Sequence, residues 1–324
     1  MKNSDHCRRW HKMHKRPIIL DCDPGVDDAY AIMLAHSNEG FDIRAITPVA
    51  GNVEFKHTSR NALDLADMLG IDTRVAKGAD RPLIIELQTA GEIHGGNGMA
   101  GYTLPMAKRE FDEMKAWDVI YEEARKFKGE LEIVAVGPLT NVAIAILKYG
   151  DLKDYVKRIV IMGGSATVGN HSQYGEFNIW VDPHAAEIVF HSGIPVTMFG
   201  LNATRQSALT SEEMYAMSDM ETSVQDLLKG INHYVFGLRG GKDWGGTITL
   251  HDAITVGYLI DESLAETRKA YVTCEMTGRN TYGQTVTDFK GLCGKEPNVD
   301  VAMVTHVEVF RNMLKGMLEF YKAN

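Results

Sequence analysis

The sequence predicts an α/β protein: a single large domain with an open, mostly parallel central sheet flanked by helices. From residue 17 to about 200, short apolar runs rich in β-branched residues alternate with segments whose apolar residues recur at helical spacing. Most of the short runs end in polar or glycine-bearing sequence, which is typical of the ligand-facing edge of such a sheet. This alternation indicates βαβ units and therefore a Rossmann-like arrangement.

The expected elements of the first two thirds follow one another in a simple order. Residues 18–20 form a β-branched run closed by Pro24-Gly25, and a helical pattern starts after Val26. Val- and Ile-rich runs of strand length follow, separated by longer segments with helical spacing of Ala and Leu. The later strands are predicted at 43–49, 131–136, 158–162 and 195–199, and the helices between them at 58–69, 141–147 and 182–191.

The last third of the chain is expected to be mainly helical, with a few strands. Residues 209–240 and 251–260 have helical spacing, and 306–322 predicts a C-terminal helix. Alternating Val, Thr and Tyr residues between 268 and 305 predict a small strand group. Since no linker or repeat divides the chain, residues 17–324 are expected to form one domain.

Charge and composition exclude several classes of protein. Residues 1–16 contain six Lys or Arg and one Asp, which predicts a basic, flexible N-terminal tail, with binding to an acidic partner as the alternative. The remainder has 28 basic and 42 acidic residues, a formal charge of −14, which argues against nucleic-acid binding. No apolar run is long enough to span a membrane, and four scattered cysteines indicate a reducing cytoplasm.

An acidic cluster stands where the first strand ends and the first helix begins. Asp21, Asp23, Asp27 and Asp28 fall within eight residues. Their carboxylates repel one another unless a cation compensates, and oxygen-only ligands suit Ca²⁺ or Mg²⁺. The alternative is structural: Asp27 and Asp28 favour the positive end of the helix, and Asp21 or Asp23 caps it.

Two later segments bring together further polar side chains. Asn170, Glu176, Phe177 and Asn178 are expected in a loop just after a predicted strand and before a helix, and such a mixture of amides, a carboxylate and an aromatic ring suits a polyhydroxylated ligand. The alternative is that Asn178 orders a turn and Asp182 caps the next helix; for Asp182 we expect the cap.

The second of these segments opens a helix, and a glycine-rich loop lies earlier in the chain. His251-Asp252 starts an apolar helix, where a histidine can donate or accept a proton near neutral pH. The glycine-rich segment 91–101 lacks the spacing of a phosphate-binding loop, and we expect it to form a mobile flap over the site.

Taken together, these motifs resemble those of the inosine-uridine preferring nucleoside hydrolase family, and they occur in the family's order. The matching segments are Asp21-Cys22-Asp23-Pro24-Gly25-Val26-Asp27-Asp28-Ala29, Val49-Ala50-Gly51-Asn52, Ile93-His94-Gly95, Gly137-Pro138-Leu139-Thr140-Asn141, Met162-Gly163-Gly164, Glu176-Phe177-Asn178 with Asp182-Pro183, and His251-Asp252-Ala253.

The resemblance implies a calcium-dependent ribonucleoside hydrolase of purine and pyrimidine salvage. A Ca²⁺ would be held by Asp23, Asp28, the backbone carbonyl of Thr140, and Asp252. A metal-bound water would attack the sugar, and Asp23 would accept its proton. The nearby carboxylates would stabilise an oxocarbenium-like transition state while the bond between base and ribose breaks.

The resemblance also implies roles for the residues that contact the substrate. His251 would protonate the leaving base, His94 would close over that base, and Phe177 would flank it. The ribose contacts implied are Asp27 and Asn178 at the 2′-hydroxyl, Asp252 at the 3′-hydroxyl, Asn170, Glu176 and Met162 near the 5′-hydroxyl, and Asn52 beside them.

Some properties are left open by the sequence, and two other functions compete. The base preference and the base-contacting residues within 231–245 are not assigned. Relatives in the family are commonly homo-tetramers or dimers. One alternative is a calcium-binding nucleoside or ribose sensor without activity. The other is a phosphatase of the haloacid dehalogenase class, which the Lys-poor rim of the site disfavours.

Overall fold

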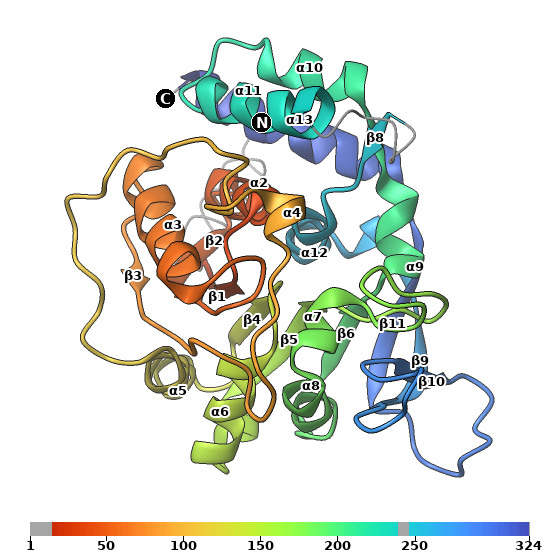
Figure 1. Ribbon diagram of the computed structural model, residues 1–324. Coiled ribbons are helices and arrows are strands. Elements are labelled where there is room, and N and C mark those ends of the chain that lie inside the picture. The colour runs from red at the N-terminus through yellow and green to blue at the C-terminus, as the bar shows by residue number, and fades with distance from the viewer. Residues whose placement is uncertain (1–14, 239–245, 324) are drawn as a thin grey trace, which may run out of the picture.

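The computed structural model contains one nine-stranded central sheet with the strand order β10-β9-β11-β6-β5-β4-β1-β2-β3 (Figure 1). The structure describes residues 15–238 and 246–323. The strands of this sheet are β1 (Arg16–Cys22), β2 (Phe41–Pro48), β3 (Arg74–Val75), β4 (Leu131–Ala135), β5 (Val156–Met162), β6 (Val196–Phe199), β9 (Ala265–Cys274), β10 (Thr285–Asp288) and β11 (Val299–Thr305). A separate two-stranded sheet pairs β7 (Leu209–Thr210) with β8 (Thr247–Ile248).

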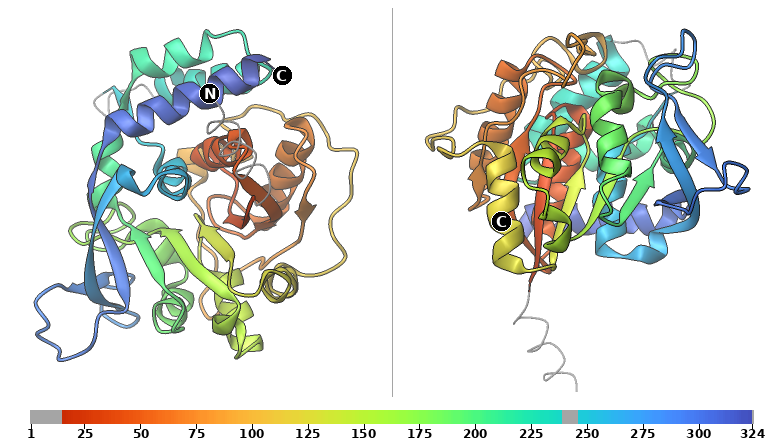
Figure 2. Two further views of the ribbon diagram at one scale, coloured as in Figure 1. Left: turned by 180° about the vertical axis from the view of Figure 1, so that it is seen from behind. Right: turned by 90° about the horizontal axis from the view of Figure 1, so that it is seen from below.

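Helices cover both faces of the sheet, as the two views in Figure 2 show. The α-helices are α2 (Val26–Ser37), α3 (Phe55–Met68), α4 (Gly91–His94), α5 (Ala116–Phe127), α6 (Thr140–Lys148), α7 (Phe177–Val181), α8 (Pro183–Phe190), α9 (Leu201–Thr204), α10 (Ser211–Ser218), α11 (Gln225–Asn232), α12 (His251–Ile260) and α13 (Val307–Ala323). A π-helical turn, His233–Leu238, follows α11, and short 3-10 turns occupy Leu152–Asp154, Arg205–Ser207 and Glu262–Leu264.

The first strand supplies both hydrophobic cores because its side chains alternate between the two faces of the sheet. Ile18 and Leu20 pack with α2, α12 and α13, whereas Ile19 packs on the opposite face with α5, α6 and α8. All three side chains are buried, which stabilises the fold by roughly 1.5–3 kcal/mol each. Cys22, the last residue of β1, is buried in the core that contains Ile18 and Leu20.

The order of the parallel strands reverses between β1 and β4. β1 pairs in parallel with β2 on one side and with β4 on the other, and β5 and β6 continue beyond β4. In open α/β sheets, ligands bind outside the carboxyl ends of the strands at such a reversal. Asp23, Gly51 and Gly137 therefore stand at the position where this fold holds its ligand.

The C-terminal strands extend the central sheet instead of forming a separate group. β11 pairs in parallel with β6 and antiparallel with β9, and β10 closes the edge. The expected strand group is therefore an antiparallel margin of the main sheet. The sequence pattern could not distinguish the two, because alternation reports which faces of a strand are buried but not its neighbours.

The predicted α/β fold is confirmed, and the differences are local. The amphipathic helix α5 was not predicted, although Ala116, Ile120 and Ala124 share a buried face. The stretch 209–240 is not one helix: β7, α10, α11 and the π-helical turn share it. The helical conformation is interrupted between α10 and α11, where the amide of Ser223 donates to the carbonyl of Tyr321.

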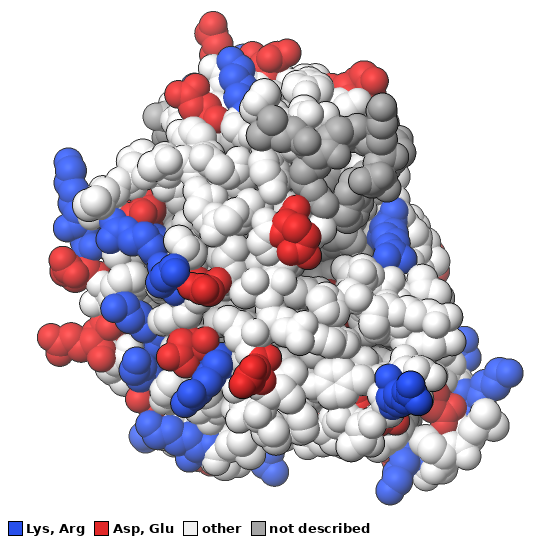
Figure 3. Space-filling view, in the orientation of Figure 1, with Lys and Arg blue, Asp and Glu red and all other residues white. Residues whose placement is uncertain are grey.

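Charge on the molecular surface is mixed on the face that Figure 3 shows. Basic and acidic side chains lie interspersed toward one side, and the middle of this face has few charged groups. None of the described helices is long and apolar enough to cross a membrane. The predicted basic tail, residues 1–16, lies outside the described residues except for Lys15 and Arg16, and Arg16 belongs to β1.

Candidate active site

One pocket of about 390 Å³ opens above the carboxyl ends of the parallel strands. Its charged lining is acidic, with Asp27, Glu92, Glu176 and Asp252, and no Lys or Arg lines it among the described residues. The other lining residues are Val26, Asn52, Ala90, Ile93, His94, Val136, Met162, Asn170, His171, Phe177, Asn178, Val235, Thr247, Ile248, Thr249 and His251. Such a wall repels phosphate and attracts cations and hydroxyl-bearing ligands.

Asp23 lies beneath this pocket, held directly after β1. Its Oδ2 accepts a hydrogen bond from the amide of Asn52 at 2.7 Å. Its Oδ1 is buried and has no hydrogen-bond partner within the described part of the chain. A Cβ on Gly51 or Gly137 would come within 2.1 Å of Oδ2 or 2.6 Å of Oδ1, so both glycines make room for the carboxylate.

Asp28 closes the first turn of α2 around the same point. Its Oδ1 accepts the amide of Asp23 at 3.1 Å, and its Oδ2 accepts the amide of Gly25 at 2.9 Å. The side-chain amide of Asn52 donates to Oδ2 of Asp28 and to the carbonyl of Asp23, both at 3.1 Å. The helix is therefore capped by Asp28 reaching back to Gly25, and the predicted alternative of a cap by Asp21 or Asp23 is wrong.

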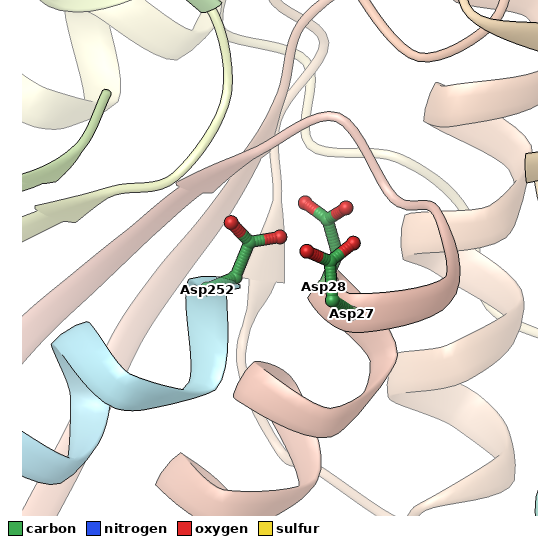
Figure 4. Close-up of side chains that lie close together, drawn as sticks. All are labelled: Asp27, Asp28 and Asp252. Carbon is green, nitrogen blue, oxygen red and sulfur yellow. The ribbon is translucent and has the colours of Figure 1, made fainter. Parts of the chain in front are cut away.

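Three carboxylates converge between the first turns of α2 and α12. Asp27, Asp28 and Asp252 can each offer an oxygen such that these oxygens lie within 4.8 Å of one another, and Figure 4 shows the side chains pointing toward a common space. The carboxyl group of Asp252 also hydrogen-bonds that of Asp28. Carboxyl groups this close share a proton or a cation, because both cannot be ionised without one.

Burial raises the pKa of every carboxyl group in the cluster. Loss of hydration, reinforced by the neighbouring Asp28, raises the pKa of Asp27 to about 7, and burial raises that of Asp28 to about 6. The pKa values of Asp23 and Asp252 are raised well above their usual range, first by burial and then by the other carboxylates. A bound cation removes this repulsion.

The donor set fits a hard divalent cation. The clustered atoms are carboxylate oxygens, and the unpartnered Oδ1 of Asp23 is a buried acceptor beside them. Oxygen ligands of this kind suit Ca²⁺ or Mg²⁺ better than zinc or copper. The residues therefore fit the expected type of metal, although Asp27, predicted to bind ribose, joins Asp28 and Asp252 in the closest group.

Asp21 supports the site from within the strand. It belongs to β1, and its Oδ2 accepts hydrogen bonds from Thr47 Oγ1 at 2.6 Å and Asn141 Nδ2 at 2.9 Å. Burial raises the pKa of Asp21 to about 7. Asp21 therefore links the end of β1 to the end of β2 and to the first turn of α6, and it does not line the pocket.

Glu176 and Asn178, two of the predicted ribose-binding residues, line the pocket from the start of α7. The side-chain amide of Asn178 donates to the carbonyls of Val136 at 2.7 Å and Met162 at 3.1 Å, which pins α7 to the ends of β4 and β5. Glu176 caps α7 by accepting from the amides of Asn178 and Ile179, and its Oε2 also accepts from Gly164 at 2.8 Å.

This arrangement also corrects the local prediction for the segment. Residues after Glu176, expected to be a loop, form the short helix α7 because Glu176 caps it. Asn170 Oδ1 accepts from the amide of Phe177 at 3.0 Å. Asp182 caps α8 through the amide of Ala185, as predicted, and accepts from Thr140 Oγ1 at 2.7 Å.

Two histidines line the pocket. His251 opens α12, and its Nδ1 lies 2.7 Å from Thr204 Oγ1. Burial, with the positive charge of Arg205 beside it, lowers the pKa of His251 to about 4, so the ring is neutral at pH 7. His94 ends α4, and its Nδ1 accepts the amide of Val26 at 3.2 Å.

The glycine-rich segment that carries His94 packs onto α2 and α3. Met99 is fully buried, and Asn61 Nδ2 donates to the carbonyls of Pro24 and Asn97. Its first residues form helix α4, which the expectation of a flap did not include. Ile93 and His94 line the pocket, so the segment does border the site as expected.

Most of the predicted site residues meet at this one place. Ten of them line the pocket: Asp27, Asn52, His94, Met162, Asn170, Glu176, Phe177, Asn178, His251 and Asp252. Asp23 and Asp28 lie beneath it, bonded to Asn52. Thr140 does not line it and instead borders a second cavity beyond α6.

Several pocket residues were missed by sequence reasoning. Glu92 and His171 stand beside His94 and Asn170 in the chain, which was the only available signal. Val235 comes from the π-helical turn, and residues 247–249 come from the segment that includes β8. Of the unassigned base-pocket region 231–245, residues 239–245 lie outside the described part of the chain.

Fold and site together define a Rossmann-like α/β enzyme with an acid-lined ligand pocket at its topological switch point. The model of the family "Inosine-uridine preferring nucleoside hydrolase" matches residues 18–312. The chain is 37% identical to the pyrimidine-specific ribonucleoside hydrolase RihA of Shewanella woodyi, over 94% of this chain and 99% of that protein. The chain belongs to the inosine-uridine preferring nucleoside hydrolase family and is a hydrolase of N-glycosyl compounds.

Other relatives agree on the family and differ in the substrates that their names give. The non-specific ribonucleoside hydrolase RihC of Escherichia coli is 37% identical over 93% of this chain and 98% of its own length. The structure of a purine-preferring ribonucleoside hydrolase from Gardnerella vaginalis has a TM-score of 0.88 at 31% identity, covering 95% of this chain and all of that one. A plant nucleoside hydrolase has a TM-score of 0.88 at 30% identity, covering 94% and 98%.

Proposed function

We propose that the protein is a calcium-dependent N-ribohydrolase that cleaves ribonucleosides to free base and ribose. The observation that carries this proposal is the pocket itself: four acidic residues and no described Lys or Arg line it, and buried carboxylates lie directly beneath. A site of this charge stabilises positive charge on a sugar and disfavours a phosphate group.

The proposed calcium ligands are Asp23, Asp28, the backbone carbonyl of Thr140, and Asp252. A calcium ion held there would supply positive charge that lowers the pKa of an attacking water. The support for this assignment is the oxygen-only donor set, together with the unpartnered Oδ1 of Asp23.

Asp23 is the proposed base for the attacking water. One of its oxygens is fixed by the amide of Asn52, which leaves Oδ1 to accept a proton. Gly51 and Gly137 leave the space that this orientation of the carboxylate needs, because a Cβ at either position would collide with one of its oxygens. A base held in one orientation needs no reorganisation when the proton moves.

The remaining acidic side chains are assigned to the sugar. Asp27 and Asn178 are proposed at the 2′-hydroxyl, Asp252 at the 3′-hydroxyl, and Asn170, Glu176 and Met162 near the 5′-hydroxyl. As the glycosidic bond breaks, positive charge develops on the ribose ring, and the carboxylates around it stabilise that charge. Asn52, both of whose side-chain donors are used by Asp23 and Asp28, holds the cluster in place.

His251 is proposed to act on the leaving base, with His94 and Phe177 beside that base. Because the pKa of His251 is lowered to about 4, its ring is a neutral donor at pH 7. A neutral imidazole can still place an N–H on the nitrogen or oxygen of the base where negative charge develops. This role requires the ring proton to sit on the nitrogen that faces the base.

Base preference, location and assembly complete the proposal. The named relatives include pyrimidine-specific, non-specific and purine-preferring enzymes at similar identities, so we propose action on purine and pyrimidine ribonucleosides alike. We also propose a cytoplasmic homo-oligomer, a dimer or tetramer, with residues 17–324 as its domain. The three cysteines in the described ranges are all unpaired, in keeping with a reducing compartment.

A substrate panel tests the reaction. Purified full-length protein is incubated with inosine, uridine, cytidine and p-nitrophenyl riboside, and free ribose is measured. p-Nitrophenyl phosphate is tested in parallel. The proposal predicts ribose release from the ribosides and no phosphate release. Intact nucleosides that nevertheless bind tightly would favour the sensor, and phosphate release would favour the phosphatase.

The stabilisation of the folded protein by calcium should be larger at high pH than at low pH. Burial raises the folded-state pKa of the proposed ligands Asp23, Asp28 and Asp252, that of Asp28 to about 6. Protonated Asp28 therefore stabilises the metal-free protein below pH 4, and this contribution is lost as the pH rises through 6. Calcium competes with these protons and relieves the repulsion. Saturating calcium should therefore raise the melting temperature of chelator-treated protein by about 5 °C or more at pH 8.

The same measurement at pH 5.5 is the control. The carboxyl groups are then largely protonated, and the calcium-induced shift should be less than about half as large. Groups that do not contact the metal titrate equally with and without calcium. The difference between the calcium-induced shifts at the two pH values therefore reports on the acidic cluster. An equal shift at both pH values would show that calcium binds elsewhere.

A further inference from the structure

The imidazole of His251 is held by a buried hydroxyl group that comes from a different part of the sheet. Thr204 Oγ1 lies 2.7 Å from His251 Nδ1, and Thr204 is fully buried. Thr204 ends α9, which directly follows β6, whereas His251 opens α12. Among the described residues, neither side chain has a second hydrogen-bond partner.

The segment that carries Thr204 is firmly fixed. Asn202 Nδ2 donates to the carbonyl of Ala302 in β11 at 2.9 Å, and Thr305 Oγ1 donates to the carbonyl of Ala203 at 3.1 Å. The amide of Thr204 donates to Gly200 at 3.0 Å, and Ser207 Oγ donates to the carbonyl of Thr204 at 2.7 Å. The hydroxyl is thus presented from a rigid element.

We infer that Thr204 is a positioning residue that sets the orientation and the tautomer of His251 for the leaving base. The inference rests on the proposed function, because it concerns the group that acts on that base. Thr204 does not line the pocket, so it would act on the leaving base only through His251.

The two ring nitrogens of His251 take different roles. A neutral imidazole has one N–H, and the nitrogen without a proton can only accept a hydrogen bond. When the hydroxyl of Thr204 donates to Nδ1, the ring proton must be on Nε2, the nitrogen free to meet a ligand. The same bond also opposes a flip of the ring, which would exchange the two nitrogens for ring carbons.

Without the hydroxyl, both constraints are lost together. Valine has nearly the shape of threonine but cannot donate, so Nδ1 of His251 would be buried without a partner. The proton would then move to Nδ1 in part of the molecules, or the ring would turn. Either change leaves Nε2 without its proton, or out of place, when the leaving group needs it.

Thr204→Val, Thr204→Ser and a His251→Ala reference test the inference on the full-length holoenzyme. The readout is the ratio of kcat on inosine to kcat on p-nitrophenyl riboside, whose leaving group needs no proton. Thr204→Val should lower this ratio about 10-fold or more, a loss in the range seen when a hydrogen bond that orients a functional histidine is removed. Thr204→Ser, which retains the hydroxyl, should restore it to within about 3-fold of wild type.

A matched control is Thr58→Val, the same exchange at another fully buried threonine, whose hydroxyl donates to the carbonyl of Phe55 in α3 and does not contact His251. This variant should leave the ratio unchanged. If Thr204→Val does not fold, Thr204→Ala serves the same comparison with Thr204→Ser. In a His251→Ala background, adding Thr204→Val should lower the ratio no further, because both changes remove the same interaction.

The outcomes separate this inference from the proposed function. A ratio that falls in His251→Ala but not in Thr204→Val overturns the role of Thr204 alone. An equal loss on both substrates in Thr204→Val, or failure of Thr204→Ser to restore the ratio, also overturns it. If His251→Ala itself leaves the ratio unchanged, the proposed role of His251 fails, and the inference fails with it.

Discussion

Replacing Asp23 with alanine is expected to abolish turnover of every nucleoside. The substitution removes the carboxylate proposed both to bind calcium and to accept the proton of the attacking water. General-base catalysis alone contributes roughly 10²- to 10⁴-fold, and loss of a metal ligand adds to that. We therefore expect kcat to fall by about 10⁴-fold or more on inosine, uridine and p-nitrophenyl riboside alike.

The matched control for this prediction is Asp21→Asn. Asp21 is equally buried two residues earlier, but it faces Thr47 and Asn141 and does not line the pocket. An asparagine there can still accept from Thr47, so activity should stay within about 10-fold of wild type. The assignment of Asp23 would be contradicted if Asp23→Ala retained more than about one hundredth of the wild-type kcat while folded.

Replacing His251 with alanine is expected to separate substrates by their leaving groups. Hypoxanthine leaves inosine with negative charge that a hydrogen-bond donor stabilises, whereas p-nitrophenolate leaves without help. His251→Ala should lower kcat on inosine by roughly 10²-fold or more and kcat on p-nitrophenyl riboside by less than about 10-fold. The measurement is kcat for both substrates with the same enzyme preparation.

A distant histidine provides the control for that comparison. His191 hydrogen-bonds Tyr271 on β9, outside the pocket, and His191→Ala should leave both rates close to wild type. Equal losses on the two substrates in His251→Ala would mean that His251 shapes the pocket or the metal site instead of acting on the base.

The overall fold could be predicted because its signals are local. Most residues of β1, β4 and β5 are apolar and buried on both faces, so their runs of Ile and Val stand out from the polar turns that follow them. The position of β9 between β10 and β11 in the main sheet could not be predicted in this way. Strand pairing depends on contacts with β11, far away in the chain, and alternation within β9 does not encode them.

The site was predictable where several functional residues share one short segment. Asp23, Asp27 and Asp28 surround a single turn, so the strand end that carries them could be recognised from the sequence. Thr204 and Val235 had no such signal. Thr204 meets His251 only because α9 lies against the start of α12, and Val235 lines the pocket because the π-helical turn borders it. An isolated Thr or Val is ordinary in any sequence, so neither residue could be recognised in advance.

Calcium dependence is tested most directly by the rate of ribose release from uridine before chelation, after removal of metal, and after calcium is returned. Removal of metal should lower the rate by about 100-fold or more, and calcium should restore it while the protein remains folded. Full activity in protein shown by elemental analysis to contain no calcium or other divalent metal would contradict this dependence.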